Sequence, residues 1–90
     1  MLDIKKEHVG FINAFLVVSE KVPLTYLNEL FLEIETEEGE SFFNFLDELF
    51  LETKNGNHFF SLPIPHQTKK WKVIFWEVIN GNIIGKEFST

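Results

Sequence analysis

The side chains that could do chemistry are few and form no catalytic pattern. His8, His58 and His66 lack the i, i+4 spacing that places two imidazoles on one helix face around a metal. No serine lies in a nucleophile elbow, and the absence of cysteine excludes a thiol nucleophile, a disulfide and a thiolate metal site. We therefore expect no enzyme activity, metal or cofactor. The alternative is a metal site in which His58 or His66 converges with Glu77 or Glu87.

Carboxylates are the commonest charged groups, with twelve Glu and two Asp against eight Lys and no Arg, for a net charge of −6. They are unevenly placed. Residues 1–52 carry twelve acids and three Lys, a balance of −9, whereas residues 53–90 carry two acids and five Lys, a balance of +3. A general acid requires a buried carboxyl, and these side chains instead have the pattern of a solvated surface. The domain should therefore have one strongly acidic side.

The region 29–52 is the best candidate for a binding surface, because no basic residue lies between Lys21 and Lys54 to neutralise it. Such a surface attracts a basic protein and accelerates its encounter. The simpler interpretation is a solvated face without a partner. The candidate partner-binding residues are Glu33, Glu35, Glu37, Glu38, Glu40, Asp47, Glu48 and Glu52.

Direct binding to nucleic acid or to a membrane is not expected. The chain has no Arg, the preferred residue for phosphate and base contacts, and its pI is 4.9. The basic-aromatic cluster 69–72 is better interpreted as charges that solubilise the start of an edge strand. The longest apolar run, Ala14–Val18, is too short to cross a bilayer. Acidic residues near Lys5 and Lys6, together with Asn13, argue against a signal peptide, so we expect a cytoplasmic protein.

The spacing of apolar residues predicts an amphipathic helix over 41–54. Ser41 is a suitable N-cap, and an apolar face then recurs at i, i+3, i+4, i+7 and i+8 from Phe42 to Phe50. Asn55-Gly56 would end the helix in the left-handed conformation. The alternative for this segment is two short strands with a break near Asp47.

Two earlier segments are ambiguous between helix and strand. The stretch 9–18 is rich in β-branched and aromatic residues, which favours strand. The stretch 25–36 fits a helix that starts near Pro23, or a strand that ends at a turn around Glu38-Gly39. Its residues 27–33 (LNELFLE) are echoed by residues 46–52 (LDELFLE), which indicates two similar amphipathic segments in similar roles.

The C-terminal third predicts an antiparallel sheet with strands near 58–62, 70–79 and 83–88. In the second strand Trp71, Val73 and Phe75 share one face, and the Asn80-Gly81 pair is a favoured two-residue hairpin turn. The chain is thus expected to form one α+β domain over 1–90, with an all-β sandwich as the alternative.

Together these features predict a small acidic binding protein. It could be an inhibitor or immunity-type protein that engages a basic, nucleic-acid-binding partner through region 29–52. The alternative function is a structural or self-assembling subunit. Eleven Phe in ninety residues cannot all be interior, so an exposed aromatic interface could form a homodimer through the C-terminal sheet edge.

Overall fold

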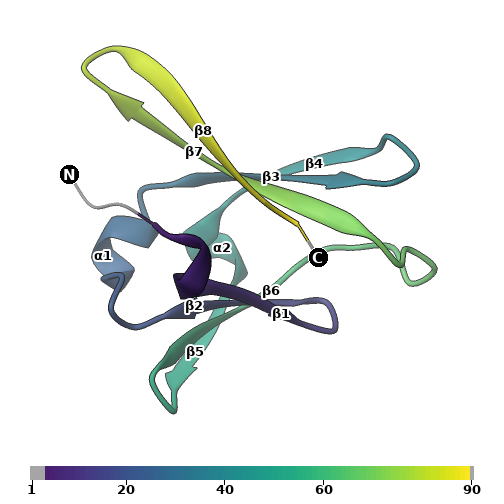
Figure 1. The fold of residues 1–90 in the computed structure, drawn as a ribbon, viewed down its shortest axis with the longest axis horizontal. Coiled ribbons are helices and arrows are strands. Elements are labelled where there is room, and N and C mark those ends of the chain that lie inside the picture. Colours follow the sequence, from purple (N-terminus) through teal and green to yellow (C-terminus); the bar gives the residue numbers. More distant parts are fainter. Residues whose placement is uncertain (1–3, 90) are drawn as a thin grey trace.

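The computed structural model describes residues 4–89, which form four successive β-hairpins (Figure 1). The expected range 1–90 therefore includes residues 1–3 and 90, which lie outside the described part. The strands are β1 (Val9–Ile12), β2 (Phe15–Ser19), β3 (Phe31–Thr36), β4 (Ser41–Phe45), β5 (Phe50–Lys54), β6 (Asn57–Ser61), β7 (Trp71–Ile79) and β8 (Asn82–Ser89). Single helical turns are η1 (Lys6–His8), α1 (Leu24–Leu27) and α2 (Leu46–Leu49). None of these helices has the length or apolar composition needed to cross a membrane.

Three of the hairpins close with two-residue turns that begin at an asparagine in the left-handed region. The φ angles of Asn13, Asn55 and Asn80 are 52°, 51° and 51°. Asparagine tolerates this conformation better than other non-glycine residues, and the resulting turns match the twist of the paired strands. The predicted hairpin turn at Asn80-Gly81 is thereby confirmed, with Gly81 at φ 80°. The Asn55-Gly56 pair closes a hairpin and does not cap a helix.

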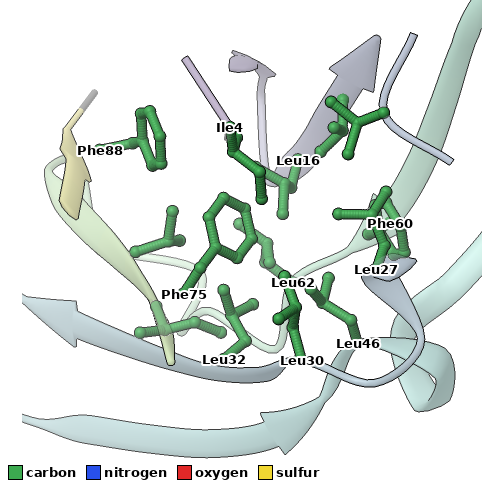
Figure 2. Close-up of a cluster of buried hydrophobic side chains, with 14 residues drawn as sticks. Ile4, Leu16, Leu27, Leu30, Leu32, Leu46, Phe60, Leu62, Phe75 and Phe88 are labelled. Carbon is green, nitrogen blue, oxygen red and sulfur yellow. The ribbon is translucent and has the colours of Figure 1, made fainter. Parts of the chain in front are cut away.

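The hairpins alternate between two antiparallel sheets. Sheet A has the strand order β1-β2-β6-β5 and sheet B the order β4-β3-β7-β8. Their inner faces bury a single apolar core that includes Leu16 and Phe60 from sheet A, and Leu32 and Phe75 from sheet B (Figure 2). This architecture fits the all-β alternative better than the expected α+β fold.

The predicted helix over 41–54 is wrong, and the alternative of two strands with a break near Asp47 is correct. Ser41 begins β4 and caps no helix; only Leu46–Leu49 is helical. The segment is rich in Phe, which packs better on a pleated sheet than in an isolated helix, and β4 gains a backbone ladder with β3. Tertiary pairing therefore outweighs the apolar periodicity, which survives only in the buried Leu46 and half-buried Leu49 of α2.

The three predicted C-terminal strands exist, but they do not form one sheet. β7 and β8 pair in sheet B, whereas β6 lies in sheet A between β2 and β5. Segment 9–18 is a hairpin of two strands, consistent with its β-favouring composition. Segment 25–36 contains both expected alternatives in succession, first α1 and then β3.

The two echoed segments have similar places in the fold. Each passes from a buried helical leucine, Leu27 or Leu46, into the first residue of a strand, Phe31 of β3 or Phe50 of β5. Each carries the chain from one sheet to the other, and the Leu46 N–H donates to the Leu30 carbonyl at 3.2 Å. The repeated sequence thus marks the two crossings that hold the sheets together at one end of the core.

The alternation along β6 gives a test of the core. Phe60→Ala should lower the free energy of unfolding by about 3–5 kcal/mol, because Phe60 is fully buried and its removal leaves a cavity. The neighbouring Phe59 lies on the opposite face and is partly exposed, so Phe59→Ala should cost about 1 kcal/mol. Urea unfolding of both variants measures the difference, and equal losses would contradict the assigned faces of β6.

Candidate functional site

The outer face of sheet B carries an unusual concentration of exposed apolar side chains. The inward-pointing Leu32 and Ile34 of β3 and Val73 and Phe75 of β7 fix which residues point outward, because successive residues of a strand face opposite sides. The outward set at one end of the sheet includes Phe43, which is 56% exposed, and Val78 and Ile83, which are each 71% exposed.

These side chains line an open groove of about 550 Å³, which we call the sheet B groove. Phe31 contacts two other lining rings, that of Phe45 edge-on at a centroid distance of 4.9 Å and that of Phe43 stacked at 6.0 Å. Among the residues that the structure describes, no basic side chain lines the groove. The acidic lining residues are Glu29, Glu33 and Glu77, but Glu77 alternates with Trp76 and Val78 along β7, so its carboxylate points to the other face of the sheet. The full lining is Glu29, Phe31, Glu33, Phe43, Phe45, Trp76, Glu77, Val78 and Ile83.

Trp76 contributes a flat indole to the groove, held from two sides. A Cβ added to Gly85 of β8 would stand 2.5, 2.7 and 2.8 Å from three consecutive carbons of the six-membered ring. Such similar distances place Gly85 under the face of the ring and not beyond its edge. On the other side of β7, the Trp76 Nε1–H donates to the Glu33 carboxylate at 3.0 Å. Gly85 and Glu33 together set the position of the indole.

Hydrogen bonding also holds the end of the groove near α1. The Tyr26 hydroxyl donates to the Glu77 carboxylate at 2.8 Å, which joins α1 to β7. Glu29 lies exposed between α1 and β3. Glu33 thus lies beside apolar surface in the groove, and the exposed Glu29 lines the groove as well.

At the opposite end of the same face, one lysine is shared by two carboxylates. Lys72 of β7 lies 3.2 Å from the Glu87 carboxylate and 3.6 Å from that of Glu35. The hydrogen bond to Glu87, followed by the charge of Glu35, raises the pKa of Lys72 above its ordinary value. Any stabilisation from the Lys72 ion pairs is therefore present below the ordinary lysine pKa and is lost as the pH rises through the raised pKa of Lys72.

The eight candidate carboxylates of region 29–52 do not form one surface. Only Glu33 lies in the groove, and Glu35 belongs to the Lys72 ion pairs. The turn between β3 and β4, at the far end of that hairpin, exposes Glu37, Glu38 and Glu40.

The remaining three candidates are further separated. Asp47 and Glu48 lie on α2, where Glu48 accepts from the Phe45 backbone N–H at 3.1 Å. Glu52 is on β5 in sheet A, 3.8 Å from Lys54. Sequence proximity therefore overstated how closely these charges lie in space.

The histidines do not converge on the candidate acids. His58 is buried in sheet A, where Nε2 lies 2.9 Å from the Val22 carbonyl and Nδ1 lies 2.7 Å from the Thr53 hydroxyl. Because a carbonyl only accepts, the contact with Val22 is a hydrogen bond donated by Nε2–H. His66 is exposed in the β6–β7 connection. Within residues 4–89, no group of three or more His, Asp or Glu side chains is arranged to hold a metal ion.

The basic-aromatic cluster 69–72 forms no stacking platform. Trp71 packs edge-on against Phe11 at a centroid distance of 6.3 Å on the margin of the core, and Lys72 is engaged with carboxylates. The aromatic platform of this protein is instead Trp76. The sequence signal for it was the outward alternation of Ile74, Trp76 and Val78 together with a glycine in the following strand.

Comparison of the chain with models of protein families, with characterised proteins and with solved structures finds no match. The function is therefore argued from the geometry of the sheet B groove.

The contact between Gly85 and Trp76 gives a direct test of the groove. Gly85→Ala should displace the indole and change the chemical shift of its Nε1–H, with a loss of about 1 kcal/mol in unfolding free energy because the half-buried ring can swing outward. Gly10→Ala is the matched control, since a Cβ at Gly10 of β1 meets no atom within 4 Å. An unchanged Trp76 indole resonance in Gly85→Ala would contradict the stacked arrangement.

Proposed function

We propose that this domain is a protein-binding module that takes a basic segment of a partner protein in the sheet B groove. The observation that carries the proposal is the combination, in one groove, of an exposed aromatic surface with Glu29 and Glu33 and, among the described residues, no basic side chain. The proposal keeps the basic partner expected from the sequence and transfers its main contact from the acidic stretch to the groove.

The apolar lining supports a binding role because folding alone does not account for it. Phe43, Phe45, Val78 and Ile83 are each at least half exposed, and they gather at one end of one sheet. Contiguous exposed apolar surface of this kind is typical of interaction sites, and aromatic side chains supply much of the binding energy at such sites.

The charge of the groove supports a basic partner. Glu29 and Glu33 would repel an acidic segment and lose solvation without compensation beneath a purely apolar one. The net charge of −6 adds long-range attraction for a cationic protein, and the turn acids Glu37, Glu38 and Glu40 extend the negative surface along the β3–β4 hairpin. Proteins that bind nucleic acid carry basic surfaces. The specific role that we favour for this domain is therefore an inhibitor that occupies the basic, nucleic-acid-binding surface of its partner.

Capture from lysate of the native host, with groove variants, tests this function. Wild-type protein should retain a basic partner at low salt and release it at high salt, because salt screens exposed charges over about 8–10 Å. The double variant Phe43→Ala/Ile83→Ala should retain at least about tenfold less, since it removes two groove side chains that are mostly exposed and contribute little to the core.

A matched control lies on sheet A. Ile12→Ala/Phe15→Ala also removes two exposed apolar side chains, 54% and 37% exposed, but outside the groove, and should bind as the wild type does. A salt-released partner that the groove variant retains would contradict the proposal. The variant Glu37→Lys/Glu38→Lys measures the share of the turn; Glu48 is left intact because it bonds the backbone of Phe45.

A second candidate function is self-assembly through β8, favoured by the exposure of this edge strand. Beyond Trp76 the β7–β8 hairpin extends past β3, and Asn82–Glu87 are all exposed (Figure 1). An unpaired edge with exposed Ile83 and Ile84 can add the same strand of a second copy.

Light scattering after size exclusion, at several salt concentrations, tests the assembly. A β8-mediated dimer should persist at high salt because backbone pairing and apolar contact are not screened, and Ile84→Lys should convert it to a monomer without unfolding it. A monomer at all salt and protein concentrations would rule out this second function.

A further inference from the structure

The outward face of Trp76 is a ready platform for a planar cation. One face of its six-membered ring lies on Gly85, so the other points away from the sheet into the groove. Because the hydrogen bond to Glu33 fixes the indole, the platform exists before a ligand binds. Tryptophan has the most favourable ring face for a cation.

The Glu33 carboxylate stands beside this platform with unused acceptor capacity. It receives one hydrogen bond from the indole, whereas an ionised carboxylate has about four acceptor sites. The ion pairs of the described residues use Glu35, Glu52 and Glu87, and none involves Glu33. An aromatic face and a carboxylate without a counterion thus adjoin in one groove.

We propose that the sheet B groove anchors an arginine side chain of the partner, with its guanidinium stacked on the outward face of Trp76 and hydrogen-bonded to Glu33. This anchor rests on the proposed function of the groove as the site for a basic protein segment. A guanidinium fits better than an ammonium because it is planar, weakly hydrated and able to fork onto a carboxylate while it stacks. The methylene stem can pack on the exposed Val78 and Ile83.

A second copy of this chain does not suit the groove. The chain contains no Arg, and a symmetric pair would bring Glu29 and Glu33 of one groove against the same two carboxylates of the other. A free small cation does not suit it either, because it would leave most of an apolar groove of about 550 Å³ unfilled. An arginine flanked by apolar residues of another protein satisfies both the charge and the surface.

Titration of the full-length protein with three short peptides, followed by NMR, tests the anchor. The probes are acetyl-Leu-Arg-Leu-amide, its lysine counterpart and its citrulline counterpart, in which a neutral urea replaces the guanidinium. The arginine peptide should shift the Trp76 indole Nε1–H resonance saturably and bind at least about tenfold more tightly than the citrulline peptide. Equal affinity for arginine and citrulline, or for arginine and lysine, would overturn the proposal, as would the absence of a saturable shift.

Glu33→Gln separates the charge of the carboxylate from its structural role. The glutamine carbonyl can still accept from Trp76 Nε1, so the indole should keep its place while arginine affinity falls about tenfold. Glu37→Gln is the matched control, since Glu37 is exposed in the β3–β4 turn and lines no part of the groove. An unchanged affinity in Glu33→Gln would contradict the anchor.

The outcome also separates this anchor from the proposed function. If the arginine peptide fails while Phe43→Ala/Ile83→Ala still loses the salt-released partner, the groove binds a basic segment by another contact and only the anchor falls. If the groove variant loses nothing as well, both fall.

Discussion

Burial of the inner faces of the two sheets is the constraint from which the rest of this structure follows. Strands alternate their side chains, so once Val73 and Phe75 are committed to the core, Ile74, Trp76 and Val78 must point outward. The same holds for β3, where buried Leu32 and Ile34 leave Phe31 and Glu33 on the surface. Aromatic side chains on the outer face are therefore a consequence of register. A one-residue slip would exchange this face with the core.

A local signal in the sequence correctly predicted the hairpin turn at Asn80-Gly81, whereas Asn55-Gly56 was expected to end a helix and instead closes a hairpin. The two-residue turn at Asn80-Gly81 requires the left-handed conformation at both positions, which Asn and Gly tolerate. The turn sets the register in which β7 and β8 pair. The failure over 41–54 has the opposite origin. Phe42, Leu46 and Phe50 satisfy a helical period and are also compatible with a strand, a turn and a strand, and only the presence of β3 as a pairing partner distinguishes the two. That partner is a tertiary fact, invisible to a window of fourteen residues.

The candidate site was hidden for a related reason. The acidic run is continuous in sequence, but a hairpin and a crossing between sheets divide it among the groove, the β3–β4 turn, α2 and sheet A. The groove itself is joined by the contact between Glu33 and Trp76, which are 43 residues apart. Predicting it would have required the register of β3 against β7. Charge composition predicts only the sign of charge that a partner would carry, whereas strand pairing determines where the exposed apolar side chains of this chain gather.

Apolar surface and uncompensated charge oppose each other in a folding protein, and their coexistence in one groove is informative. Glu33 is held against an indole by a hydrogen bond, so its carboxylate is not free to swing fully into solvent. Holding carboxylates beside aromatic rings reduces their hydration without supplying a cation, which costs free energy in the unbound domain. At the other end of the same face, Lys72 of the chain itself forms ion pairs with Glu35 and Glu87. At the groove end the described part of the chain supplies no such cation to Glu33. A cation from another molecule, with apolar neighbours to cover the aromatic rings, would compensate both the charge and the exposed surface.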